Sequence, residues 1–214
     1  VVDVAKAERS AIVEMLLQSG LWTRIVERPF GVIANPDVEP KAIFVSAFDS
    51  APLAPDYNFV LSAEKASVEA GMAVLARLTS GKVHLSARKG DEGFMSSIKG
   101  VEYHTFSGKH PVGNVGVQIH HIDRIAKGDI VWTVNIQDVA IIGRFAMTGK
   151  LDMTKIIAVA GSEAQKACYK RIISGASIES IVGKVASNVR IISGDVLTGS
   201  KSTADGYIAM NANM

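Results

Sequence analysis

The sequence predicts an α/β protein in which a parallel-sheet domain over residues 1–150 precedes a small β-grasp-like domain over residues 151–214. Two observations support this prediction. Strand-like and helix-like segments alternate over residues 1–100, which is typical of a parallel sheet covered by helices. After residue 150 the order changes to two strands, a short helix and further strands. A chain of 214 residues can bury a substantial core in either arrangement.

A helix and a long loop are expected to precede the first strand of the sheet. Residues 4–19 place apolar side chains on one helical face, and Gly20 is well placed to end that helix in a left-handed conformation. Residues 21–40 contain three prolines and predict an irregular loop. Lys41–Ala47 is a short, continuous apolar run, which is typical of a strand buried on both faces.

The next elements continue the alternation. Residues 62–79 have the apolar spacing of a helix, with Ser62 as the candidate N-cap. Strands are expected at Lys82–Ser86 and Val101–Phe106, with a short helix over Gly93–Lys99 between them.

Two more strands and a helix are expected before residue 150. Residues 115–122 and 130–134 alternate apolar and polar side chains, as half-buried strands do. Gln137–Met147 has a helical pattern, and Gly149 closes it.

The remaining residues predict the small second domain. Lys155–Ala160 is an apolar strand that Ala167–Ile173 is expected to join. Ser177 is the candidate cap of a short helix over residues 177–182, and Arg190–Ser193 is a further strand. This order fits a small β-grasp-like domain.

Composition excludes several classes of protein. Hydrophobic residues make up 48% and charged residues 21%, which is ordinary for a globular chain and argues against disorder. The net charge is only +2 and the basic residues are scattered, so nucleic acid is not an expected partner. The longest stretch without a charged side chain, residues 110–122, is too short for a membrane helix, which needs about 20 apolar residues.

Motifs of self-contained enzymes are missing from the sequence. The first strand is not followed by G-x-G-x-x-G, and there is no Walker A, H-E-x-x-H or G-x-S-x-G sequence. Cys168 is the single cysteine, so an internal disulfide and an all-cysteine zinc or iron–sulfur site are both excluded within this chain. We therefore predict no catalytic residue, no bound cofactor and no metal site.

The segment from His110 to Asp123 is the first candidate for a ligand or partner contact. Gly113 and Gly116 follow a proline and permit close approach of the backbone to a ligand or another chain. His120 and its neighbouring histidine would point to opposite faces of a strand, which argues against a shared metal ion. These histidines are then either structural, or hydrogen-bond donors to a quinone, a carboxylate or a partner.

Two further segments follow the carboxyl ends of predicted strands, where open α/β sheets bind ligands. The polar residues Asn135, Gln137 and Asp138 lie between a strand and a helix, where they either cap the helix or contact a ligand. The loop Asp49–Asp56 carries carboxylates, which serve either as general bases or only as solvated loop residues. Trp22 and Trp132 are expected to anchor a core or an interface.

A set of short motifs, spread in order along nearly the whole chain, carries a family resemblance. They are Gly20–Thr23, Arg28–Phe30, Phe44–Ala47 with Asp49, Pro52–Ala54, Leu75–Thr79, His110–Pro111 with Gly113 and Gly116, His120 with Asp123, Val131–Trp132, Gln137–Val139, and Ile192–Gly194 with Leu197–Gly199. With these motifs the chain resembles the A subunit of the bacterial sodium-translocating NADH:quinone reductase (Na+-NQR). The resemblance implies that the chain is an internal fragment of such a protein.

The resemblance also implies a fold. The family is similar to the NADH- and flavin-binding subunit of respiratory complex I and to the C subunit of the Rnf complex, which implies a Rossmann-like domain followed by an SLBB, or ubiquitin-like, β-grasp domain. In the flavin-binding relatives, a run of glycines after the first helix cradles the flavin phosphate. The stretch Gly20–Gly31 instead carries Trp22, Ile25, Val26 and Phe30. We therefore expect the flavin and NADH sites to be lost.

The function implied is that of a peripheral subunit on the cytoplasmic face of the bacterial inner membrane, inactive as an isolated fragment. Ubiquinone is its possible ligand and a membrane subunit its chief partner, while NADH, FAD, FMN, Fe–S clusters and Na+ belong to other subunits. Two alternatives stay open: an FMN- and NADH-binding flavoprotein like that of complex I, or a purely structural assembly subunit. The candidate quinone or partner contacts are His110, Gly113, Gly116, His120, Asp123, Gln137 and Asp138.

Overall fold

The computed structural model describes residues 3–164 and 166–214, which divide into two compact units. The α/β unit contains the residues up to Phe48 and Tyr57–Asp152, and the C-terminal unit contains Asp49–Asp56 and Met153–Met214. The loop Asp49–Asp56 thus groups with the second unit, where the backbone N–H of Asp56 donates to the hydroxyl of Tyr169 at 3.0 Å. Nothing in the sequence predicts this exchange, because it depends on contacts over more than a hundred positions.

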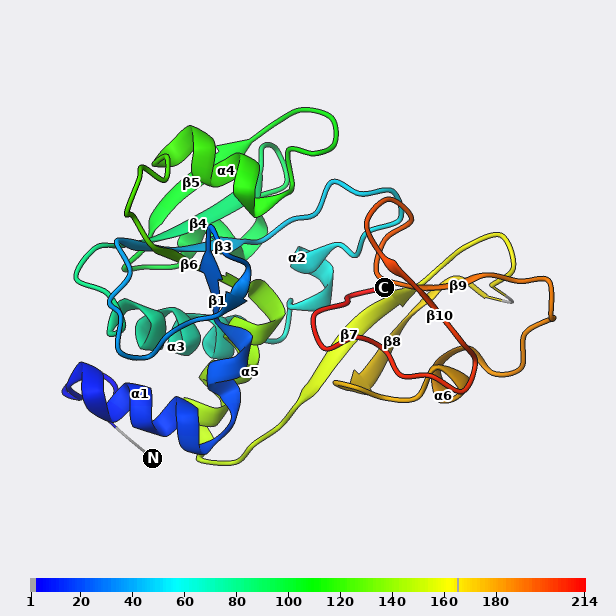
Figure 1. Cartoon of the computed structure of the whole chain (residues 1–214), viewed down its shortest axis with the longest axis horizontal. Coiled ribbons are helices and arrows are strands. Elements are labelled where there is room, and N and C mark those ends of the chain that lie inside the picture. Colours follow the sequence, from blue (N-terminus) through cyan, green and yellow to red (C-terminus); the bar gives the residue numbers. More distant parts are fainter. Residues whose placement is uncertain (1–2, 165) are drawn as a thin grey trace. The chain divides into compact units, whose positions relative to one another are not determined.

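A six-stranded sheet forms the centre of the α/β unit (Figure 1), in the order β2-β1-β6-β3-β4-β5. Strands β6, β3, β4 and β5 run parallel to one another, as predicted, whereas β1 is antiparallel to both β6 and β2. The strands are β1 (Val26–Arg28), β2 (Val32–Ile33), β3 (Ala42–Ser46), β4 (Lys82–Arg88), β5 (Glu102–Phe106) and β6 (Val131–Asn135).

The predicted irregular loop over residues 21–40 is wrong in part. It contains a 3-10 helix, η1 (Leu21–Arg24), and the two strands β1 and β2 that extend the sheet. Each strand is only two or three residues long and is recognisable only through its pairing, so hydrophobic periodicity gives no signal for it.

Helices cover both faces of this sheet. Figure 1 shows α3 and α5 on one side and α4 on the other. The helices of the unit are α1 (Arg9–Gln18), α2 (Tyr57–Val60), α3 (Lys65–Ala76), α4 (Val115–Ile122) and α5 (Ile136–Thr148), with a second 3-10 helix, η2 (Gly93–Ser97). Gly71 and Gly143 bring the backbones of α3 and α5 together, because a methyl group on Gly143 would overlap the carbonyl of Ser67 and one on Gly71 the carbonyl of Val139.

The strand predicted over residues 115–122 is wrong, because these residues form helix α4. Val115, Val117 and Ile119 alternate as in a strand, but Val115, Ile119 and Ile122 also have the spacing of one helical face. That face packs on a buried cluster of the sheet formed by Ala42, Phe44 and Val131. This eight-residue segment fits both the strand period and the helix period, and its packing against the sheet favours the helix.

Helix boundaries differ at two other places. Helix α1 begins at Arg9, five residues after the predicted start, and α3 begins at Lys65 with Glu64 rather than Ser62 at its N-cap. The residues before α3 form a turn, closed by the N–H of Glu64 donating to Leu61 at 2.8 Å. The terminators are confirmed, since Gly20 and Gly149 have φ of +76° and +67°.

The C-terminal unit has the predicted order of elements. Strands β7 (Thr154–Val159) and β8 (Cys168–Ile173) pair antiparallel, and α6 (Ile178–Val182) begins where the hydroxyl of Ser177 accepts from the N–H of Ser180 at 3.3 Å. Strands β9 (Ile191–Ser193) and β10 (Ser200–Ser202) form a second hairpin. Buried isoleucines from β7, β8, α6 and the final segment make its core: Ile157, Ile172, Ile178, Ile181 and Ile208.

No helix among residues 3–164 and 166–214 combines the length and the apolar character needed to cross a bilayer.

Candidate functional site

The carboxyl edge of the parallel strands holds a small polar cluster, which we call the carboxyl-edge cluster: Ser46, Gly113 and Gln118. Ser46 ends β3, and its hydroxyl donates to the carbonyl of Phe48 at 2.9 Å. The side-chain N–H2 of Gln118, on α4, donates to the Ser46 hydroxyl at 2.9 Å and to the carbonyls of Val112 and Gly113 at 3.3 Å each. These bonds tie the segment before α4 to the end of β3, where open α/β sheets bind ligands.

Gln118 carries the strongest chemical signal in this cluster. Its side chain is 1% exposed, and its Oε1 has no hydrogen-bond partner within the described part of the chain. The amide is oriented by the three acceptors around its N–H2, so the oxygen is the atom left over. A buried acceptor without a donor is costly, and it offers a hydrogen bond to any hydroxyl or N–H that reaches it. The candidate segment His110–Asp123 includes Gln118, but sequence analysis did not single this residue out, because its role shows only through contacts.

The two glycines of this segment have different surroundings. Gly113 is buried in the cluster, whereas Gly116 lies exposed in the first turn of α4. An ideal Cβ on Gly116 would lie 3.2 Å from Nη2 of Arg28, which comes from β1. The close approach that the glycine permits is therefore to an arginine of this chain, while contact with a ligand or partner stays a prediction.

His120, His121 and Asp123 lie at the other end of α4. Both histidines are exposed in the last turn of the helix, with ring centroids 5.4 Å apart. Asp123 accepts from Nζ of Lys41 at 2.7 Å, and Lys41 directly precedes β3. Gly113 lies beside Ser46, at the opposite end of this strand. The structure thus separates His120 and Asp123 from Gly113 by the length of a strand. His110 is half-buried at the start of the segment.

Because His120 and His121 lie on a helix, the expectation that strand geometry turns them to opposite faces does not apply. Within residues 3–164 and 166–214, no three His, Cys, Asp or Glu side chains are grouped so that they could hold a metal ion.

The turn at the end of β6 caps a helix. Oδ1 of Asn135 accepts from the N–H of Gln137 at 2.9 Å, which confirms the capping interpretation. Asp138 is 6% exposed and accepts from Nη1 of Arg24 at 2.9 Å, and Arg24 is itself 4% exposed. Sequence analysis missed this buried ion pair, because the two residues are 114 positions apart. The carboxylate of Asp138 is held by Arg24 inside the unit.

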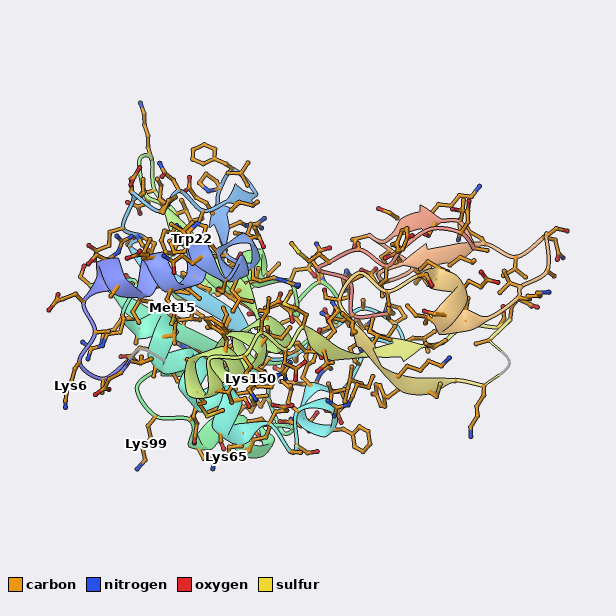
Figure 2. The ribbon with its side chains drawn as sticks, turned by 90° about the horizontal axis from the view of Figure 1, so that it is seen from below. Lys6, Met15, Trp22, Lys65, Lys99 and Lys150 are labelled. Atoms are coloured by element: carbon orange, nitrogen blue, oxygen red, sulfur yellow. The ribbon has the colours of Figure 1, made fainter. Side chains whose placement is uncertain are left out.

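The first half of the stretch Gly20–Gly31 packs into the core, whereas Phe30 is 67% exposed and does not fill the loop. Trp22 and Ile25 are 3% and 0% exposed, and the indole N–H of Trp22 donates to the carbonyl of Ala34 at 2.7 Å. The indole also packs edge-on against Trp132 at a centroid distance of 5.4 Å, which confirms both tryptophans as core anchors. Figure 2 shows Trp22 within the α/β unit, whereas Lys6 and Lys99 project outward. A flavin phosphate needs open backbone N–H groups, and the expected loss of the flavin and NADH sites stays a prediction.

A histidine pair that the sequence did not reveal lies on the α4 side of the sheet. Nδ1 of His84, on β4, is 3.0 Å from Nε2 of His104, on β5. The ring of His84 is stacked on Phe44 at a centroid distance of 4.6 Å, and the residue is 8% exposed. Burial, followed by the nearby His104, lowers the pKa of His84, and burial lowers the pKa of His104. The pair is therefore mostly neutral at pH 7.

Comparisons with protein families cover most of the chain. A family described as "NqrA second alpha/beta domain" matches residues 7–151, and one described as "NQRA C-terminal domain", of SLBB type, matches residues 156–204.

Curated relatives share the same description. The chain is 40% identical over 201 residues to the A subunit of the Na(+)-translocating NADH-quinone reductase of Serratia proteamaculans, a match that covers 93% of this chain and 45% of the relative. It is 40% identical over 186 residues to the corresponding protein of Neisseria meningitidis serogroup B, covering 86% of this chain and 42% of the relative. The chain thus spans less than half the length of these relatives.

Solved structures show the same fold at low identity. Two structures of an NAD+-reducing [NiFe]-hydrogenase, in the air-oxidized and the H2-reduced state, match with TM-scores of 0.61 and 0.67. Identity is 15% and 13%, and the matches cover 97% and 99% of this chain but 45% and 46% of the hydrogenase chains.

Proposed function

Because the chain belongs to the NqrA family, the A subunits of the Na+-translocating NADH-quinone reductases, we propose that it is a quinone-associated, peripheral part of such a complex. In this proposal it lies on the cytoplasmic face of the bacterial inner membrane and docks on a membrane subunit. It carries no flavin or iron–sulfur centre of its own, and other subunits hold the redox groups and Na+. The observation that carries the proposal is the match of both domains to this family.

The surroundings of the stretch Gly20–Gly31 support the absence of a flavin. The N–H of Ile25 donates to Trp22 at 3.0 Å and the N–H of Gly31 donates to Glu27 at 2.8 Å, so these donors are used inside the loop. Arg24, a cationic side chain within this stretch, is committed to Asp138. A phosphate that recruited this arginine would have to break the buried ion pair.

The carboxyl-edge cluster is the place we propose for quinone contact. It lies at the strand ends where α/β sheets bind ligands, and it contains Gly113 from the original candidates together with Gln118. The unpaired Oε1 of Gln118 would accept from a hydroxyl of the reduced quinol, whereas the oxidised quinone offers it no donor. Because this atom is buried, the residues around it have to shift for a head group to reach it. Reduced quinone is therefore expected to bind more tightly than oxidised quinone.

A two-dimensional NMR titration of the chain with a short-chain, water-soluble ubiquinone tests the proposal. The oxidised and reduced forms are titrated separately, with FMN in parallel. We expect saturable shifts around Ser46 and residues 112–118 and none from FMN. The matched variants are Gln118→Leu, which removes the acceptor, and His121→Gln, which changes an exposed residue at the other end of α4. Only the first is expected to abolish the shifts.

The two alternatives give different results in the same experiment. Saturable FMN binding in the micromolar range would support a flavoprotein that binds FMN through an unusual loop. A scaffold predicts no shift from either ligand. It also predicts that quinone fails to bind this protein within the assembled complex, and that assembly fails when exposed residues of the C-terminal unit are changed.

A further inference from the structure

The tip of the loop Asp49–Asp56 is a type II turn that has leucine where glycine is usual. The N–H of Ala54 donates to the carbonyl of Ala51 at 3.3 Å and closes a four-residue turn around Pro52 and Leu53. The proline ring fixes φ of Pro52 at about −65°, and φ of Leu53 is +64°, the combination that defines this turn type. The second central position favours Gly or Asn, because a Cβ is crowded in the left-handed conformation. Leu53 is the only non-glycine residue with a positive φ among residues 3–164 and 166–214.

The strained backbone at Leu53 holds an apolar side chain in solvent. The residue is 58% exposed, so packing inside the chain does not account for keeping a leucine at this position. Glycine would form the same turn without strain. What leucine adds is the apolar side chain itself, displayed at the tip of the loop. Strained residues of this kind cluster at binding and switch regions, so the side chain of Leu53 is a candidate for a contact with a partner.

The loop that carries this turn is fixed on both sides of the tip. Before it, Oδ1 of Asp49 accepts from the N–H of Ala51 at 2.8 Å. After it, the N–H of Asp56 donates to the hydroxyl of Tyr169 at 3.0 Å. Ala51 and Pro55, which flank the exposed tip, are both buried. A tip that is already ordered loses little conformational freedom on binding, so the loop is preorganised for a contact.

We propose that Leu53 inserts into a pocket on a membrane subunit of the reductase complex, and that this pocket has apolar walls and a basic rim. The inference rests on the proposed function, because it takes docking on that subunit as its starting point. The charge of the loop indicates the rim, since Asp49 and Asp56 are carboxylates and the loop between them contains no Lys, Arg or His. The same carboxylates disfavour the anionic surface of a lipid bilayer.

Two matched variants separate a role in the fold from a role in binding. Leu53→Asn removes the apolar contact, and asparagine tolerates the left-handed conformation. Leu197→Asn makes the same change at a leucine of the same unit that is 56% exposed and has no positive φ. In urea unfolding followed by circular dichroism, Leu53→Asn should keep the folding equilibrium constant or raise it up to about fivefold, because strain is relieved. A fall in stability would show that Leu53 serves the fold, and it would overturn the proposal.

Binding is measured with detergent-solubilised reductase complex prepared without its A subunit. The unchanged protein should bind, and its affinity should fall as NaCl is added, because salt screens the basic rim. Leu53→Asn should weaken binding by about tenfold or more, whereas Leu197→Asn should change it by less than about twofold. Leu53→Gly, which relieves the strain fully, should give the same loss as Leu53→Asn.

The outcomes separate this proposal from the proposed function. If the unchanged protein fails to bind the complex, docking itself is wrong and the pocket for Leu53 with it. Binding that survives Leu53→Asn, or that falls equally in Leu197→Asn, overturns the role of Leu53 and leaves docking in place. Two other occupants are tested in parallel. Self-association in analytical ultracentrifugation that Leu53→Asn abolishes would assign a second copy of the chain, and Leu53-dependent co-sedimentation with phosphatidylglycerol vesicles would assign lipid; either result overturns the proposal.

Discussion

On the side of the sheet covered by α3 and α5, the strands present Ile43, Val45 and Leu85, each 1% exposed or less. On the α4 side, the same strands present Phe44, Ser46 and His84. The first side is closed by apolar packing and by direct backbone contact between helices. The second holds the carboxyl-edge cluster and the histidine pair. Both sides are buried, so burial alone does not mark a functional face; the informative difference is which polar groups a face keeps and whether they are paired.

The largest expected effect comes from the ion pair in the first turn of α5. Asp138→Ala leaves the buried Arg24 without its carboxylate and should lower the free energy of unfolding by about 3–5 kcal/mol. Urea unfolding followed by tryptophan fluorescence measures it. The double variant Arg24→Met/Asp138→Leu replaces both charges by apolar groups and should recover most of the loss. A small loss of stability in Asp138→Ala would mean that water reaches the ion pair more readily than its burial indicates.

The contact between α3 and α5 gives the next largest effect. Gly143→Ala places a methyl group against the carbonyl of Ser67 and should cost about 3 kcal/mol or more. The matched control is Gly116→Ala, on α4, where the added methyl meets only the mobile end of Arg28 and alanine favours the helix by about 1 kcal/mol. Equal losses of stability in the two variants, by the same unfolding measurement, would mean that helix packing on the two sides of the sheet is equally close.

A smaller loss is expected when the carboxyl-edge cluster is changed. Gln118→Leu removes the donor to Ser46 and to two carbonyls, but it also removes an unpaired oxygen. These effects oppose each other, so we expect a loss of about 1 kcal/mol, at the low end of the usual cost of about 1–3 kcal/mol for one unsatisfied group. His121→Gln, on the exposed side of the same helix, should stay within about 0.5 kcal/mol. A loss of several kcal/mol would mean that the bonds donated by Gln118 outweigh the cost of its unpaired oxygen by more than we expect.

The smallest effect concerns the amino end of β3. Lys41 contacts Asp123 at 2.7 Å and Asp129 at 3.1 Å, and all three side chains are partly exposed. Asp123→Asn should therefore change stability by less than about 0.5 kcal/mol, and about 1 M NaCl should remove even that. Stability measured at low and high salt checks this, with Asp129→Asn as the companion variant. A larger, salt-resistant loss would assign Asp123 a role that its geometry does not show.

Some parts of the fold that depend on local sequence were predicted correctly, although the N-cap expected at Ser62 and the start of α1 were not. The strand over residues 42–46 is a continuous apolar run, and Gly149 and Ser177 end and begin helices through their own backbone and side-chain chemistry. The segment 115–122 was assigned to the wrong element because eight residues fit two periods equally well. Because this segment is a helix and not the expected strand, the candidate residues that lie close together differ from those that the sequence indicates.

The site was predictable only in its location at strand ends. Gln137 follows a predicted strand, so topology places it at the carboxyl edge, whereas Gly113 was a candidate only through its glycine-rich segment. The ion pair between Arg24 and Asp138 and the contact between His84 and His104 join residues far apart in sequence. No spacing rule identifies them, because each depends on the order of strands in the sheet.

The loop Asp49–Asp56 has a consequence for dividing the protein into pieces. It leaves β3 of the α/β unit, yet it groups with the C-terminal unit, where Ala51 is 8% exposed. A truncated chain that begins at Met153 would lack this segment, and one that ends at Asp152 would keep it without the surface it packs on. The two halves are therefore not exchangeable modules: a recombination point at residue 152 separates residues that belong to one compact unit, and a chimaera must take the loop and the C-terminal unit from the same parent.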